Sequence, residues 1–170
     1  YNLLNESLQK TPEARPDEIL NKLSNGIYKM LRQNSGNWCV KDGLEISMIA
    51  YNKENNIIEY AGARRPMFLV RNNELIKISP DRFPIGFHTG EHLQRFSNHT
   101  LQTQKGDAVY LFSDGYYNQF GGTKNKKFSA LQFQQNLLSI YHLEMEEQKK
   151  ILQKKFEDWM GSQPQIDDVL

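Results

Sequence analysis

Residues 108–115 read AVYLFSDG, and this stretch carries the strongest local signal in the chain. Its first five residues are apolar at every position, which predicts a β-strand over 108–112 with both faces buried. The strand ends at Ser113, so Asp114 emerges at its tip beside Gly115. A strand end holds a carboxylate rigidly, and a glycine lets a backbone, an ion or a substrate approach closely. These residues mark a candidate site, although an ordinary Asp-Gly turn explains the same letters.

Predicted helices flank a block of predicted strands along the chain. Apolar residues recur at spacings of three and four in four segments, which predicts helices at 2–10, 16–33, 131–141 and 145–159. Apolar runs with shorter periods predict strands at 44–50, 57–61, 67–71, 74–78, 95–102 and 108–112, and Val169 and Leu170 look like the start of another. The order of helices, strands and helices favours a layered α+β domain with antiparallel strands.

The composition excludes some classes of function. The 170 residues include 21 Lys and Arg against 20 Asp and Glu, a formal charge of +1 that gives no electrostatic case for binding nucleic acid. No apolar run approaches the roughly 20 residues that span a bilayer, so we expect no membrane contact from this segment. The single cysteine, Cys39, cannot form an intrachain disulfide, which favours a reducing, cytoplasmic location. The full-length protein remains free to carry a membrane attachment elsewhere.

Two further charged motifs are candidates. Asp167 and Asp168 are adjacent carboxylates whose repulsion a divalent cation would relieve, and oxygen ligands of this kind suit magnesium or manganese. A solvated acidic loop is the alternative. Arg64 and Arg65 stand before Pro66, and a guanidinium can bind phosphate through two hydrogen bonds. A solvated turn is the alternative there.

The motifs taken in order resemble the SpoIIE-like branch of the PPM-type protein serine/threonine phosphatases, the metal-dependent relatives of type 2C. The segments that carry the resemblance are 61–66 (AGARRP), 84–86 (PIG), 105–107 (KGD), 111–115 (LFSDG), 120–122 (FGG) and 167–169 (DDV). The resemblance implies an α+β fold, a four-layer α-β-β-α sandwich with two antiparallel sheets. Residues 1–170 would form the C-terminal part of such a domain, incomplete at both ends.

The resemblance also implies a metal site. The family holds two Mn²⁺ or Mg²⁺ ions with aspartates at sheet edges, and the matching metal ligands here are Asp114 and Asp167, the latter in preference to Asp168. It gives no separate catalytic or cofactor-binding side chain. The upstream Asp-Gly-x-Gly-type motif, whose aspartate bridges both metals, does not occur in this chain, and the family pattern places it just before Tyr1. We therefore expect a truncated domain with little or no phosphatase activity of its own.

The function that follows from the resemblance is hydrolysis of phosphoserine or phosphothreonine by the output domain of a bacterial signalling protein. Its substrate would be a phosphorylated regulatory protein such as an anti-sigma-factor antagonist, and sensor domains would lie N-terminal to it. Two other interpretations stay open. The chain could be a catalytically silent interaction or dimerisation module with the same fold, or an α+β domain in which Asp114 and Asp167 are only turn residues.

Overall fold

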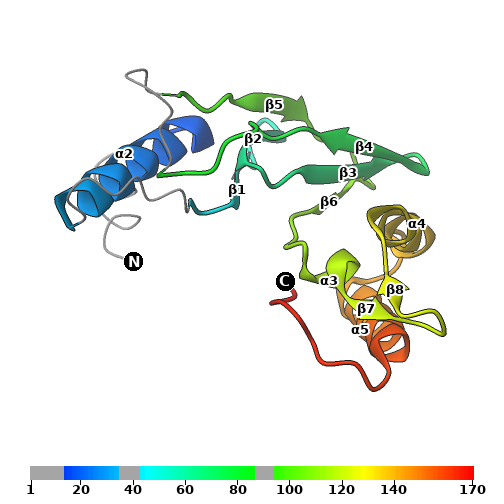
Figure 1. The fold of residues 1–170 in the computed structure, drawn as a ribbon. Coiled ribbons are helices and arrows are strands. Elements are labelled where there is room, and N and C mark those ends of the chain that lie inside the picture. Colours follow the sequence, from blue (N-terminus) through cyan, green and yellow to red (C-terminus); the bar gives the residue numbers. More distant parts are fainter. Residues whose placement is uncertain (1–13, 35–42, 87–93) are drawn as a thin grey trace. The chain divides into compact units, whose positions relative to one another are not determined.

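The computed structural model describes residues 14–34, 43–86 and 94–170, which form two compact units (Figure 1). Among these residues, the first unit comprises 14–34, 43–67, 78–86 and 94–104, and the second comprises 68–77 and 105–170. The predicted helix at 2–10 and Cys39 lie outside the described residues. None of the helices in the described ranges is long and apolar enough to cross a membrane.

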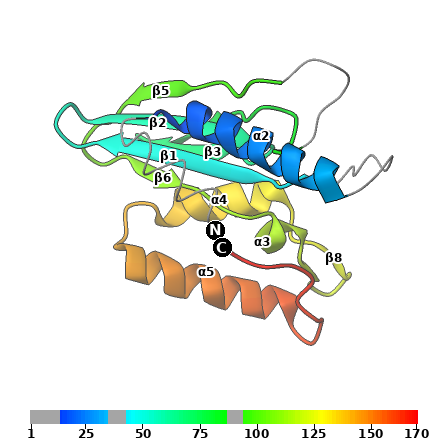
Figure 2. The same ribbon diagram turned by 90° about the vertical axis from the view of Figure 1, so that its left-hand side faces the viewer.

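The first unit is a three-stranded antiparallel sheet with one helix packed against it (Figure 2). The helix is α2 (Pro16–Asn34), and the strands β1 (Ile46–Asn52), β2 (Ile57–Ala63) and β5 (His99–Gln102) lie in the order β1-β2-β5. Pro16 suits a first helical position because its missing N–H has no partner there anyway. Ile19, Leu20 and Leu23 are buried against the alanines of β2, as their helical spacing predicts.

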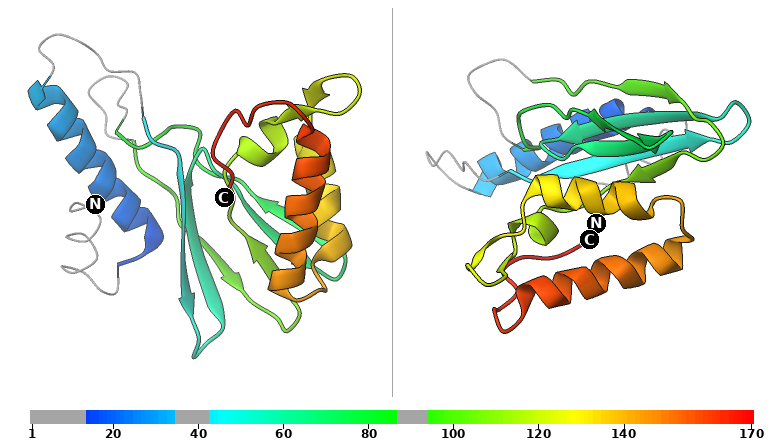
Figure 3. Two further views of the ribbon diagram at one scale, coloured as in Figure 1. Left: turned by 90° about the horizontal axis from the view of Figure 1, so that it is seen from below. Right: turned by 90° about the vertical axis from the view of Figure 1, so that its right-hand side faces the viewer.

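The second unit contains a second three-stranded sheet, a two-stranded sheet and three helices (Figure 3). Strands β3 (Met67–Arg71), β4 (Glu74–Ile78) and β6 (Ala108–Tyr110) lie in the order β4-β3-β6. The short helix α3 (Gly115–Asn118) precedes a small hairpin of β7 (Phe120–Gly121) and β8 (Lys126–Lys127). Helices α4 (Ala130–Ile140) and α5 (Met145–Met160) follow, and both contribute buried side chains to the core of this unit.

An aromatic cluster forms that core. The ring centroid of Phe112 lies 4.5 Å from that of Phe68 in β3 and 5.1 Å from that of Phe133 in α4. Tyr116 of α3 lies 5.2 Å from Phe156 of α5 and donates its hydroxyl hydrogen to the carbonyl of Leu152 at 2.8 Å. Rings at these separations attract each other beyond the area they bury. The cluster therefore fixes the chain on both sides of residues 113–115.

The glycines of the FGG segment allow α5 to approach the β7–β8 hairpin closely. A Cβ atom on Gly121 would lie 1.9 Å from the carbonyl oxygen of Trp159. The same carbonyl accepts a hydrogen bond from the Gly122 amide at 2.8 Å, and the indole of Trp159 donates to the carbonyl of Gln119 at 3.1 Å. Any side chain at position 121 would therefore force the hairpin and the helix apart.

Most of the predicted elements are confirmed. The expected helices at 16–33, 131–141 and 145–159 and the strands at 67–71 and 74–78 are present within one or two residues. Asn72 and Asn73 join the latter two strands with φ of 51° and 64°, as a two-residue hairpin turn requires. The α+β class with antiparallel sheets is likewise confirmed.

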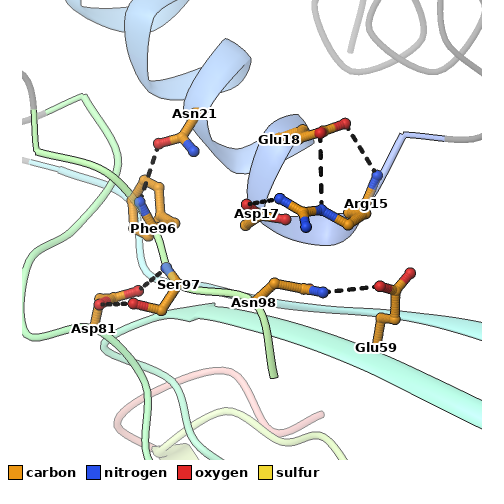
Figure 4. A network of polar contacts seen from close by, with 9 residues as sticks. All are labelled: Arg15, Asp17, Glu18, Asn21, Glu59, Asp81, Phe96, Ser97 and Asn98. Carbon is orange, nitrogen blue, oxygen red and sulfur yellow. Dashed lines mark hydrogen bonds and ion pairs between the residues drawn. The ribbon is translucent and has the colours of Figure 1, made fainter. Parts of the chain in front are cut away.

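The strand expected at 95–102 begins only at His99, because side chains accept the hydrogen bonds of two backbone amides before it (Figure 4). The Phe96 amide donates to Asn21 Oδ1 at 3.1 Å, and the Ser97 amide donates to Asp81 Oδ2 at 2.7 Å. These bonds replace the backbone ladder. The side-chain amide of Asn98 in turn donates from Nδ2 to Glu59 Oε1 at 2.9 Å.

Two expectations in the second unit are wrong. The strand expected at 108–112 ends at Tyr110, and Leu111 is 37% exposed, so the run is not buried on both faces. The start of a strand at Val169 and Leu170 is absent, because the Leu170 amide donates to the Ser113 hydroxyl at 3.1 Å and enters no ladder.

Burial makes the second unit sensitive to alkali at Tyr116. Burial raises the pKa of Tyr116 to about 12, above the value of about 10 for an unfolded chain. The neutral phenol thus stabilises the fold fully below about pH 10, and this stabilisation is lost as the pH rises from about 10 to 12.

Tyr116→Phe should lower the free energy of unfolding by about 1 kcal/mol near neutral pH, because the bond to Leu152 is lost. The difference in free energy of unfolding between wild type and variant, measured by denaturant titration, should then narrow as the pH rises from about 10 to 12. A constant gap over that range would contradict the assignment.

Candidate metal site at the end of strand β6

The turn over residues 113–115 is built from the buried residues on either side of it. Phe112 and Tyr116 are 8% and 4% exposed, whereas Asp114 between them is half-buried. Asp114 occupies the N-cap position of α3, yet its carboxylate makes no hydrogen bond to the helix amides. Its Oδ2 atom instead accepts a hydrogen bond from Asn118 Nδ2 at 2.9 Å. The core thus presents the carboxylate from a fixed backbone, but Asp114 stands at the start of α3 and not at the strand tip that the sequence predicted, because β6 ends at Tyr110.

The C-terminal segment lies directly against this turn. Ser113 Oγ donates to the carbonyl of Asp168 at 2.7 Å and accepts from the Leu170 amide. A Cβ atom on Gly115 would lie 2.2 Å from the Asp168 carbonyl oxygen and 3.3 Å from the carbonyl carbon of Asp167. The absence of a side chain at Gly115 is what allows this approach. The two acidic motifs, far apart in the sequence, therefore meet through their backbones.

Gln119 holds the same segment a few residues earlier, and sequence reasoning missed it. This side chain is fully buried. Its Nε2 atom donates to the carbonyl of Pro164 at 2.9 Å, and its Oε1 atom accepts from the Ile166 amide at 3.3 Å. Hydrophobic periodicity does not reveal this role, because Gln119 is a polar residue. Its only indication in the sequence is that a polar side chain stands close to a predicted buried segment.

The acidic side chains differ in their surroundings. Asp167 is exposed, and its Oδ1 atom accepts from the backbone amide of Asp168 at 2.8 Å. Asp168 is exposed as well. Across residues 14–34, 43–86 and 94–170, no group of three or more His, Cys, Asp or Glu side chains is placed to hold a metal. Carboxylate oxygens suit Mg²⁺ or Mn²⁺, but Mg²⁺ needs a near-octahedral set of six oxygen ligands, so Asp114 and Asp167 could supply only part of it.

The arginine pair lies in the first unit and has a carboxylate partner. Arg65 lies 2.9 Å and Arg64 3.6 Å from Glu45, measured between side-chain nitrogen and oxygen. Arg64 has a φ of 59°, and the carbonyl of Arg65 accepts hydrogen bonds from Tyr60 at 2.5 Å and Ser47 at 3.0 Å. The segment is therefore a turn whose two arginines are ion-paired with Glu45 and whose Arg65 carbonyl is bonded to Tyr60 and Ser47.

Comparison with known proteins decides the family. The sequence model of the family described as stage II sporulation protein E (SpoIIE) matches residues 2–170. The chain belongs to the SpoIIE family. A search of curated protein sequences finds no match.

Solved structures share the fold of this SpoIIE-family chain. The SiaA-PP2C domain of Pseudomonas aeruginosa is 18% identical with a TM-score of 0.86, over 99% of this chain and 63% of that chain. The phosphatase domain of the cell fate determinant SpoIIE from Bacillus subtilis is 15% identical with a TM-score of 0.58, over 99% of this chain and 69% of that chain. RsbX in complex with magnesium is 14% identical with a TM-score of 0.64, over 98% of this chain and 67% of that chain. The chain thus has the PP2C fold and spans less than two thirds of the SiaA-PP2C chain.

The close approach at Gly115 gives a test of how the C-terminal segment is held. Gly115→Ala places a methyl group against backbone atoms of Asp168. We expect the variant of this SpoIIE-family chain to lose about 1–3 kcal/mol of stability, because overpacked atoms must shift. Hydrogen exchange at the amides of residues 166–170 should accelerate more than exchange in β3.

Gly106→Ala is the matched control. It also adds a methyl group in the second unit, at a φ of 92°, but nothing lies within 4 Å of the new Cβ atom. It should strain its own turn and leave exchange at 166–170 unchanged. Equal acceleration in both variants would show that the effect of Gly115→Ala is general destabilisation.

Proposed function

We propose that this chain is part of a metal-dependent protein serine/threonine phosphatase, in which Asp114 and Asp167 ligate Mn²⁺ or Mg²⁺. The observation that carries the proposal is the backbone of Asp167 and Asp168 packed against Gly115, next to the half-buried carboxylate of Asp114. Membership of the SpoIIE family supports it. Related structures include RsbX with magnesium and a manganese-presoaked SpoIIE phosphatase domain.

The proposed reaction is hydrolysis of a phosphoserine or phosphothreonine. The oxygen of a water molecule attacks phosphorus, the bond between phosphorus and the side-chain oxygen breaks, and a proton passes to that oxygen as it leaves. Divalent cations bound at the site would neutralise phosphate charge and lower the pKa of the water. The chain's own contribution is positional, since the aromatic core fixes Asp114 and Ser113 holds the segment that carries Asp167.

This proposal requires a further aspartate ligand from outside this chain to complete the site. The 170-residue chain alone should bind metal weakly and show little turnover, whereas the full-length protein should be active. The substrate proposed is a phosphorylated regulatory protein, such as an anti-sigma-factor antagonist, in cytoplasmic bacterial signalling controlled by N-terminal sensor domains.

A catalytically silent interaction module with the same fold is the second candidate. The lack of a three-ligand group among the described residues, and the use of one Asp167 oxygen on the neighbouring amide, favour it. An Asp-Gly-x-Gly-like motif immediately before Tyr1 in the full-length protein would support the enzyme, and its absence there would support the silent module.

Removal of Asp114 tests the enzyme directly. The full-length protein should hydrolyse p-nitrophenyl phosphate and a phosphoserine peptide in a manganese-dependent manner. Asp114→Ala should reduce kcat by about 100-fold or more, because a metal ligand is lost, while the circular dichroism spectrum is unchanged.

Asp158→Ala is the control, because Asp158 is an exposed aspartate on α5 outside the site. Its activity should equal that of the wild type. Full turnover by Asp114→Ala would refute the assignment of Asp114, and strong manganese-dependent turnover by the 170-residue chain alone would refute the need for an outside aspartate.

A further inference from the structure

Asp114 is linked to a lysine through a single amide group. Lys127 Nζ donates to Asn118 Oδ1 at 3.1 Å, and Asn118 Nδ2 donates to Asp114 Oδ2 at 2.9 Å. A carboxylate can only accept hydrogen bonds and an ammonium group can only donate them. The orientation of the Asn118 amide between them is therefore fixed by chemistry: its oxygen faces the lysine and its nitrogen faces the aspartate.

The backbone brings the three residues close together. Asn118 is the last residue of α3 and follows Asp114 by four residues, so the two side chains are neighbours on one helical turn. Lys127 pairs with Phe120 across the β7–β8 hairpin, and its ammonium lies 5.9 Å from the centre of that ring. Backbone bonds from Phe128 to Gln119 and from Ser129 to Tyr117 fasten the end of the hairpin to α3.

We propose that Asn118 is a spacer, a positioning residue that keeps the Lys127 ammonium off Asp114 so that the carboxylate stays available to a divalent cation. This inference rests on the proposed function. An ammonium bonded directly to Asp114 would form a charge-assisted hydrogen bond and compete with the cation for the same oxygens. The intervening amide bonds to the ammonium and to one oxygen of the carboxylate, and it keeps the two charged groups apart.

The exposure and flexibility of Lys127 make the spacer necessary. Lys127 is exposed, and its four-carbon stem lets the ammonium follow an available anion. If Asn118 is shortened to alanine, the ammonium loses its hydrogen bond and keeps only its contact with the Phe120 ring, and Asp114 loses its bond at the other end of the same amide. The loss caused by removing Asn118 should therefore depend on the presence of Lys127.

A double-mutant cycle on Mn²⁺ affinity measures that dependence. Free Mn²⁺ is monitored by electron paramagnetic resonance in titrations of the full-length protein, without substrate. Asn118→Ala should weaken binding by about tenfold, within the range for partners of metal ligands. Lys127→Met keeps the apolar stem and should change binding by less than about threefold, since an exposed charge is screened. The double variant should return to within about threefold of the wild type.

Recovery in the double variant is the result that a simple structural role cannot produce. If Asn118 only closes α3, or is itself a metal ligand, the double variant should remain as weak as Asn118→Ala, and the spacer proposal falls. Thermal unfolding without metal shows whether each variant folds. If Asn118→Ala does not fold, Asn118→Ser takes its place in the cycle with the same expected recovery.

Two further variants separate this inference from the proposed function. Asn136→Ala removes a similar pair elsewhere in the unit, because Asn136 Oδ1 accepts from Lys155 at 2.7 Å, and it should leave Mn²⁺ affinity unchanged. Asp114→Ala should weaken Mn²⁺ binding strongly. If it does not, the metal assignment itself fails, whereas loss in Asp114→Ala with none in Asn118→Ala overturns only the spacer.

Discussion

The packing of Phe112 and Tyr116 into one aromatic core is the interaction on which the candidate site depends. These two residues stand on either side of the Ser-Asp-Gly turn, and both are buried among rings from β3, α4 and α5. A short turn between two buried anchors has little freedom, so the half-buried carboxylate of Asp114 is presented from a fixed backbone. The core of the second unit thus does more than stabilise the fold, because it sets the position of a polar side chain at its edge.

Small and polar residues complete what the aromatic core begins. Gly115 leaves room for the C-terminal segment, Ser113 bonds to it twice, and Gln119 holds it again at residues 164 and 166. None of these contacts involves a regular strand or helix pairing. The segment that carries Asp167 is therefore held by specific side chains, and its position depends on each of them.

The sequence predicts the elements well because most of them rely on local periodicity. The apolar run ending at Phe112 and the glycine after Asp114 were enough to locate the turn, and the helical spacing of Leu20 and Leu23 located α2. The role of Gln119 and the link from Lys127 through Asn118 could not be read in the same way. They depend on how the β7–β8 hairpin returns to α3, which no local pattern encodes. The strand expected at Val169 is absent for a similar reason. The amide of Leu170 donates to the hydroxyl of Ser113, a residue far away in the sequence.

The contact between the FGG segment and Trp159 has a consequence for the order in which the protein matures. The chain leaves the ribosome from its N-terminus, so the Ser-Asp-Gly turn is synthesised well before α5. Gly121, Gly122 and the Gln119 carbonyl all meet Trp159 at the end of that helix, and Phe156 one turn earlier packs on Tyr116. The packing of the turn against Phe156, and that of the FGG segment against Trp159, can form only once α5 has emerged, so the surroundings of Asp114 are completed after that helix is synthesised.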